Sequence, residues 1–83
     1  MNIQLRFFAS LREALGATGS LSVPESTTVG QARELLIARG APFDAALARG
    51  RALRAALNQT LCEESAALSE GDELAFFPPV TGG

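Results

Sequence analysis

The last segment of the chain reads Gly71-Asp72-Glu73-Leu74-Ala75-Phe76-Phe77-Pro78-Pro79-Val80-Thr81-Gly82-Gly83. Its first two residues are typical of a turn, and residues 73–77 have the composition of a β-strand. Pro78 ends this strand because proline has no N–H to donate to a neighbouring strand. We therefore expect a folded domain over residues 1–77 and a flexible arm over residues 78–83.

The composition of this arm suits insertion into a partner. Pro78 and Pro79 favour an extended polyproline path, whereas Gly82 and Gly83 lack a Cβ and let the backbone pass through a narrow space. Fully extended, the arm would reach on the order of 20 Å. With Gly83 as the terminus, we expect an unhindered α-carboxylate at its tip. Terminal glycines also occur in frayed chain ends, so the two glycines alone leave both interpretations open.

Upstream of this segment, strand and helix signals follow one another. Ile3, Leu5 and Phe7 alternate with polar residues, which predicts a strand over residues 2–8. Thr27 or Thr28 is expected to cap the main helix, whose apolar stripe ends before Gly40. The other predicted elements are a helix over residues 11–15 capped by Ser10, a strand over 20–23, a helical turn over 43–48, strands over 53–57 and 60–62 joined by a turn at Asn58-Gln59, and a crossover over 63–70 anchored by Leu68. This order predicts an α+β fold with one main helix on one face of a mixed sheet.

The inventory of reactive groups is small. The 83 residues are 47% hydrophobic and 19% charged, which is typical of one globular domain. There is no histidine and only one cysteine, Cys62, so Ser-His and Cys-His arrangements, a disulfide framework and a cysteine metal cluster are all excluded. We expect no intrinsic catalysis, and no cofactor or metal bound by this chain. Cys62 itself is interpreted as a small core residue.

Charge and hydropathy restrict the partners. The formal net charge is −2 and the sequence has neither Tyr nor Trp, so nucleic acid is not an expected partner. No apolar stretch is long enough to span a membrane and no leader pattern precedes the first strand, which predicts a cytoplasmic protein without a membrane partner. All seven basic residues are arginines, so the chain has no ε-amine for isopeptide bonds to itself.

Three segments connect the sequence with a known family: residues 5–9 (Leu-Arg-Phe-Phe-Ala), residues 57–61 (Leu-Asn-Gln-Thr-Leu) and residues 71–83. They resemble the small subunit of molybdopterin synthase, a family with the β-grasp, or ubiquitin-like, fold. The resemblance implies that the first and last strands lie parallel in the centre of the sheet, with short helical insertions around the main helix. The Phe-Phe-Pro-Pro-Val sequence favours this family over the sulfur carriers of thiamine synthesis and tRNA thiolation, which also end in diglycine.

The resemblance implies that the chain carries sulfur. An adenylyltransferase of the ubiquitin-activating type would use ATP and Mg²⁺ to adenylate Gly83, and a sulfur donor would replace AMP to leave a thiocarboxylate. The tail would then enter the active site of the large subunit, where sulfur passes to a pyranopterin precursor and builds the dithiolene of molybdopterin. Gly82 would allow passage through the channel. A heterotetramer of small and large subunits is expected from the family.

The strand phases predict where a partner docks. If Ile3, Leu5 and Phe7 face the core, Phe8 points to the opposite face, where Phe77 and Leu61 are expected beside it. In the family, the corresponding phenylalanines and leucine contact the large subunit and the activating enzyme. The predicted interface consists of Phe8, Leu61, Phe77, Pro78, Pro79, Val80 and Thr81. The alternative is that the short insertions cover Phe8 or Phe77 internally.

Two functions of other classes stay open at this point. A ubiquitin-like modifier would attach Gly83 to lysines of other proteins. A β-grasp interaction module with an inert tail would need no chemistry at Gly83.

Overall fold

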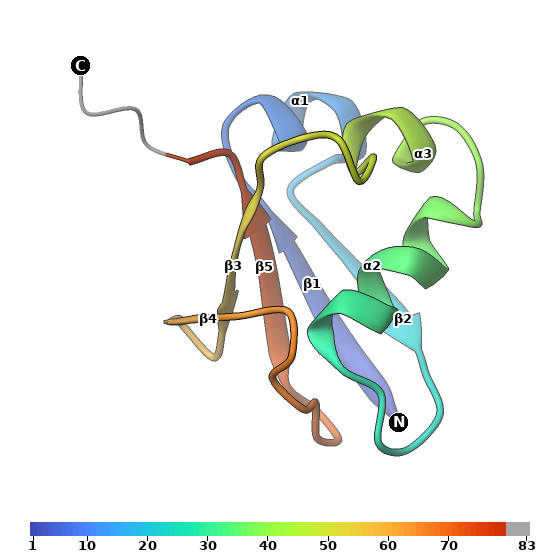
Figure 1. Cartoon of the computed structure of the whole chain (residues 1–83), viewed down its shortest axis with the longest axis vertical. Helices are drawn as coiled ribbons and strands as arrows, with labels where there is room; N and C mark the ends of the chain where they lie inside the picture. The colour runs from blue at the N-terminus through green and yellow to red at the C-terminus, as the bar shows by residue number, and fades with distance from the viewer. Residues whose placement is uncertain (80–83) are drawn as a thin grey trace.

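The computed structural model describes residues 1–79, in which five strands form one mixed sheet (Figure 1). Along the chain the elements are β1 (Asn2–Phe7), α1 (Ser10–Leu15), β2 (Thr18–Ser22), α2 (Val29–Ile37), α3 (Phe43–Ala46), β3 (Arg54–Leu57), β4 (Thr60–Cys62) and β5 (Glu73–Phe77). The spatial order is β2-β1-β5-β3-β4. β1 and β5 are parallel neighbours in the centre, and the other strand pairs are antiparallel. This is the predicted β-grasp topology, with α2 as the main helix.

Apolar and polar residues alternate along β1, and the apolar ones face the core as predicted. Ile3, Leu5 and Phe7 are each at most 2% exposed, and in the parallel register Leu5 lies opposite Leu74 and Phe7 opposite Phe76. These side chains pack against the buried face of α2, which includes Val29, Ala32 and Leu36. The core therefore lies between α2 and one face of the sheet.

The main helix begins directly after Thr28, one of the two threonines that were expected to cap it. Thr28 is the N-cap: its hydroxyl accepts from the backbone N–H of Gln31, and the Gln31 side chain accepts from the N–H of Thr28. This reciprocal capping box satisfies two backbone donors that a helix start leaves unpaired. Gly40, with φ +83°, turns the chain shortly after the helix ends at Ile37.

The short helices differ from their predicted bounds. Ser10 was expected to cap α1, but it is already the first helical residue, and Ala9 with φ 55° precedes it without a side-chain cap. Only Phe8 separates Ala9 from the end of β1, and the positive φ of Ala9 turns the chain so that the helix starts one residue early. α3 spans Phe43–Ala46 and is shorter than the predicted turn over residues 43–48.

The second half of the chain follows the predicted order closely. Asn58 and Gln59 form the tight β3–β4 turn, with φ values of 49° and 69°. Leu68 anchors the crossover: its side chain is 4% exposed and its N–H donates to the carbonyl of Thr27 at 3.0 Å. Within the described residues, no helix is long and apolar enough to cross a lipid bilayer.

Candidate functional site

The sheet face that α2 leaves uncovered is called the outer face below. Since successive strand residues alternate between faces, Phe8 and Phe77 point away from the core that contains Phe7 and Phe76. Phe8 is 43% exposed and Phe77 is half-buried, and both line one hollow of about 410 Å³. The short insertions thus leave Phe8 exposed.

Two alanines form the floor of this hollow. Ala75 of β5 lies opposite Ala56 of β3 in the antiparallel register, and both line the hollow. Ala75 is only 4% exposed, although it faces away from the core, because larger side chains stand around its methyl group. The remaining lining residues are Phe8, Ala9, Gln59, Glu73, Phe77 and Pro78. A central depression with small residues inside and aromatic residues at its wall can accept an apolar side chain.

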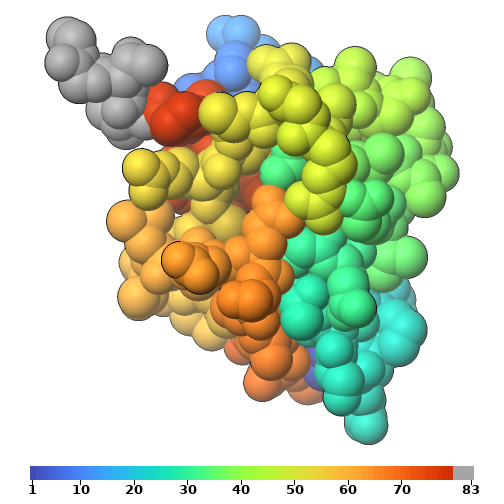
Figure 2. Space-filling model, in the orientation of Figure 1, coloured from blue at the N-terminus to red at the C-terminus, as the bar shows by residue number. Residues whose placement is uncertain are grey.

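Leu61 extends the apolar surface to the edge strand. It lies opposite Ala56 in the β3–β4 pairing, so both side chains are on the outer face, and it is 64% exposed. Pro78 lines the hollow, and Pro79 follows it as a half-buried residue. The other predicted interface and tail residues, Val80, Thr81, Gly82 and Gly83, lie outside the described residues. In Figure 2 the red end of β5 reaches the surface at one corner of the molecule.

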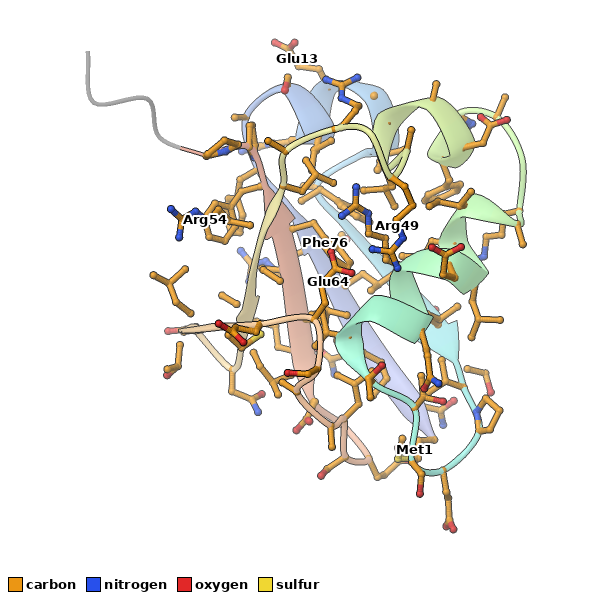
Figure 3. The ribbon with its side chains drawn as sticks, viewed as in Figure 1. Met1, Glu13, Arg49, Arg54, Glu64 and Phe76 are labelled. Carbon is orange, nitrogen blue, oxygen red and sulfur yellow. The ribbon has the colours of Figure 1, made fainter. Side chains whose placement is uncertain are left out.

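The outer face has two arginines, and only one of them pairs with a carboxylate among the described residues. Arg6 lies 3.6 Å from Glu73, and its guanidinium stands 5.7 Å from the centroid of the Phe8 ring. Arg54 lies opposite Phe77 in the register and points outward from β3 (Figure 3). The predicted interface omitted the two alanines and Arg54. The alternation along residues 54–57 and 73–77 was the signal that could have found them, because it places Arg54, Ala56 and Ala75 on the same face as Phe77.

The Asn-Gln turn fixes one end of the hollow. The Asn58 side chain accepts from the N–H of Glu73 at 3.0 Å and donates to the Asp72 carboxylate at 3.0 Å. The backbone N–H of Asn58 also donates to the carbonyl of Glu73 at 2.8 Å. Three bonds from one residue therefore tie the β3–β4 hairpin to the beginning of β5, which holds Gln59 and Glu73 in place at the wall.

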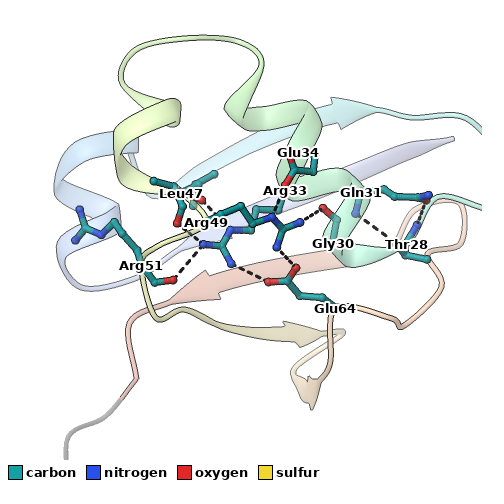
Figure 4. A network of polar contacts seen from close by, with 10 residues as sticks. Thr28, Gly30, Gln31, Arg33, Glu34, Leu47, Arg49, Arg51 and Glu64 are labelled. Carbon is teal, nitrogen blue, oxygen red and sulfur yellow. Dashed lines mark hydrogen bonds and ion pairs between the residues drawn. The ribbon is translucent and has the colours of Figure 1, made fainter.

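A polar network on the other side of the sheet holds the chain that leads into β3. Arg33 of α2 is 3% exposed and donates to the carbonyls of Leu47 and Ala48 at 2.7 and 2.6 Å (Figure 4). It also reaches the carbonyl of Arg51 at 3.2 Å and the Glu64 carboxylate at 2.7 Å. Residues 47–51 are thus fastened to α2 directly before β3 begins.

Arg49 completes this network from the surface. Its guanidinium pairs with Glu34 and Glu64 and donates to the carbonyl of Gly30 at 3.1 Å. Its hydrogen bond holds the pKa of Glu64 below the usual range, with a smaller contribution from Arg33. The bond to Glu64 in turn raises the pKa of Arg49. A side chain at Gly30 would crowd this network, because a Cβ there would stand 3.2 Å from the Cβ of Glu64.

The described part of the chain shows no cluster of three or more metal-binding side chains. Cys62 is half-buried, and burial raises the pKa of its thiol. A raised pKa keeps a thiol protonated and poorly nucleophilic. The outer face of residues 1–79 offers apolar contact at the hollow and a charge pair between Arg6 and Glu73.

The comparisons with known proteins cover almost the whole chain. The ThiS family model matches residues 5–83. A molybdopterin synthase sulfur carrier subunit from Escherichia coli is 42% identical over 81 residues, and one from Haemophilus influenzae is 41% identical over 81 residues. Each match covers 98% of this chain and 99% of the relative.

Solved structures are similar along the full length. The crystal structure of SAMP1 from Haloferax volcanii has a TM-score of 0.78 and 30% identity, with 100% of both chains covered. A chain in the complex of subunits 1 and 2 of the molybdopterin-converting factor from Helicobacter pylori has a TM-score of 0.68 and 22% identity, also with 100% of both chains covered. At 22% identity, the similarity to the Helicobacter pylori chain shows a shared fold alone.

Proposed function

Because this chain belongs to the ThiS family, we propose that it works as the sulfur carrier subunit of a molybdopterin synthase. One observation carries the proposal: two curated relatives with that name match 98% of the chain at 41% and 42% identity. The ThiS family model spans residues 5–83, which include both the outer-face residues and the diglycine segment. The role is therefore proposed for the whole chain and not for a shared fold alone.

The proposed chemistry takes place at Gly83. A carboxylate is a poor electrophile, so the activating enzyme uses ATP and Mg²⁺ to convert the α-carboxylate into an acyl adenylate and releases pyrophosphate. A donor at the oxidation level of sulfide then attacks the acyl carbon and AMP leaves, which gives a thiocarboxylate. These reactions would take place in the cytoplasm, where ATP is available. The carrier chain itself contributes the reacting terminus, and its partners contribute the acid-base groups.

The outer face is the proposed docking surface for the large subunit. Phe8, Leu61 and Phe77 would contact that subunit, while Pro78, Pro79, Val80 and Thr81 lead Gly82 and Gly83 into its active site. Support comes from the position of the hollow, because Pro78 both lines the hollow and begins the tail. A partner seated on the hollow thus stands next to the point where the tail leaves the sheet. In the active site of the large subunit, sulfur passes from Gly83 to the pyranopterin precursor, and two such transfers complete the dithiolene.

An intact-mass experiment tests this function. The purified chain is incubated with a cognate activating enzyme, ATP, Mg²⁺ and a sulfide source, and its mass is measured by electrospray. We expect a mass increase equal to the exchange of one oxygen for one sulfur, located in the C-terminal peptide. A variant that lacks Gly83 serves as the control and should keep its mass. An unchanged wild-type mass beside an activating enzyme that converts its own carrier would reject the proposal.

One observation favours a second candidate function. The Haloferax SAMP1 structure is 30% identical to this chain, and a related solution structure from Methanosarcina acetivorans is described as a small archaeal modifier protein. A modifier would join Gly83 to lysines of other proteins. Proteolytic peptides with a remnant of the Val80-Thr81-Gly82-Gly83 segment on lysine would support that role. Abundant thiocarboxylate without such peptides would rule it out.

A further inference from the structure

We infer that Arg54 is a specificity residue whose guanidinium pairs with a carboxylate on the large subunit, beside the apolar group that fills the outer-face hollow. The inference rests on the proposed function, which supplies the large subunit as the partner. It adds a charged contact to a docking surface that was described above by its apolar residues.

The sheet register places Arg54 inside the area that such a partner covers. Arg54 lies directly opposite Phe77 in the β3–β5 pairing, so both side chains are on the outer face. Phe77 and Pro78 line the hollow, and Pro78 begins the tail. A protein that contacts Phe77 and receives the tail therefore also covers the surface around Arg54. Figure 3 shows Arg54 on the same side of the molecule as the end of β5.

The two arginines of this face differ in their local partners. Arg6 is balanced by Glu73 at 3.6 Å and also stands over the Phe8 ring. Arg54 forms no ion pair with any of residues 1–79, and it is exposed to water. In the free chain, water solvates this guanidinium, which is why it needs no internal partner.

Docking changes this situation. A partner that covers Phe77 removes water from the neighbouring guanidinium, and an arginine that loses water without gaining an acceptor is strongly unfavourable. A carboxylate is the matching acceptor because its two oxygens fit the planar guanidinium fork. The expected complement on the large subunit is thus an Asp or Glu next to the apolar side chain in the hollow. Partners with a neutral or basic residue there would be rejected.

The experiment compares charge variants in binding to the cognate large subunit. Arg54→Gln removes the charge, Arg54→Glu reverses it, and Arg54→Lys keeps it without the fork. Arg39→Glu is the matched control, since it gives the same change in net charge as Arg54→Glu. Arg39 donates to the carbonyl of Ser20 on β2, at the far edge of the sheet from β3 and β4. Dissociation constants are measured by calorimetry at about 50 mM and about 500 mM NaCl, and thermal unfolding confirms that each variant is folded.

We expect Arg54→Glu to weaken binding by about tenfold or more at low salt, with Arg54→Gln and Arg54→Lys in between. Salt should weaken the wild-type complex more than the Arg54→Gln complex, whereas Arg39→Glu should bind within about twofold of wild type. Arg54→Glu binding within about twofold of wild type, or an equal loss for folded Arg39→Glu, would overturn the inference and leave the proposed function intact. Absence of wild-type binding to the large subunit would instead remove the proposed function and the inference with it.

Discussion

Arg33 is a buried residue whose contacts join α2 to two later segments of the chain, residues 47–51 and the crossover that contains Glu64. Its guanidinium is nearly inaccessible to water and serves three backbone carbonyls of residues 47–51 and one carboxylate from the crossover. Arg33→Ala would leave those acceptors without their donor in a buried place. We expect a loss of about 3 kcal/mol in the free energy of unfolding, measured by urea denaturation. Arg51→Ala is the control, because the Arg51 side chain is exposed and a surface truncation changes stability by about 0.5 kcal/mol or less. Equal losses in the two variants would show that the buried network contributes nothing.

Glu64 gives this network a pH dependence. Its pKa is lowered in the folded chain by Arg49 first and Arg33 second, from a reference of 4.5. Between the folded pKa and 4.5, the unfolded chain binds more protons, so stability rises with pH in that window. The stabilisation is complete above pH 4.5 and is lost as pH falls through the folded pKa.

The Glu64→Gln variant tests whether Glu64 makes the stability of the protein rise with pH in this window. We expect wild type to be more stable than Glu64→Gln above pH 4.5, with a difference that shrinks as the solution is acidified further. Urea midpoints of both proteins, measured at several pH values, give the comparison. Glu13→Gln is a suitable control, because Glu13 is exposed on α1 and forms no ion pair among the described residues. A wild-type advantage that stays constant through the acid range would contradict the assignment.

At the residue scale, the sequence predicts apolar burial better than polar burial. The sequence predicts an apolar stripe on α2 that consists of Val29, Ala32, Leu36 and Ile37. The first three are inaccessible to water, and Ile37 is half-buried. Arg33 lies four residues after Val29 and three before Leu36, so the same helical period places it on that face. Its charge nevertheless indicates a surface position. The acceptors that make its burial favourable come from residues 47–51 and 64, and no local pattern connects them with α2.

The turn of the β3–β4 hairpin has a strained backbone and also contributes Gln59 to the wall of the hollow. Asn58 and Gln59 both have positive φ, the combination that a two-residue type I′ turn requires. Asparagine tolerates this region, and glutamine does so with a larger steric cost. We therefore expect Gln59→Gly to stabilise the protein by about 0.5 to 1 kcal/mol, since relief of strain exceeds the added freedom of the unfolded chain.

Thermal unfolding compares this variant with Thr60→Gly in the adjoining strand. Glycine in a strand interior weakens the strand, so Thr60→Gly should lower the unfolding temperature while Gln59→Gly raises it. If Gln59→Gly lowered the unfolding temperature as well, the turn would gain more from the glutamine side chain than it loses in strain.

At the scale of elements, the sequence predicts the order and types correctly, and it places a strand end correctly where a local signal marks it. The strand predicted over residues 20–23 lacks such a signal at its start and instead spans Thr18–Ser22. Pro78 stops β5 at Phe77, and Asn58-Gln59 separates β3 from β4. The beginning of α1 was wrong because it depends on the backbone of Ala9, an alanine with positive φ that no propensity predicts. The hollow was missed for a different reason. Strand alternation puts Ala56 and Ala75 on the same face as Phe77, but only the β3–β5 register places them opposite each other as the floor, and periodicity leaves that register open.

For the molecule as a whole, the parallel pairing of β1 and β5 decides where the tail begins. Parallel strands end on the same side of a sheet, so Phe8 after β1 and Pro78 after β5 come together at one end of the outer face. The same pairing is visible in Figure 1, where both strands run toward α1. The apolar wall and the base of the tail are thus neighbours, although 70 positions separate Phe8 from Pro78 in the sequence.

This geometry predicts that exposed apolar residues on the two sides of the molecule differ in function. Phe8 on the outer face and Leu35 on α2 are almost equally exposed, at 43% and 41%. We expect Phe8→Ala to weaken binding to the cognate large subunit by about tenfold or more, because truncation of a buried interface aromatic commonly costs at least 1 to 2 kcal/mol. Leu35→Ala should bind as wild type does, since α2 lies on the opposite side of the sheet. Calorimetric titration of both variants, with unfolding temperatures as a check on folding, decides the matter. If Leu35→Ala lost as much affinity as Phe8→Ala, the partner would dock on the helical side, and the outer face would lose its proposed role.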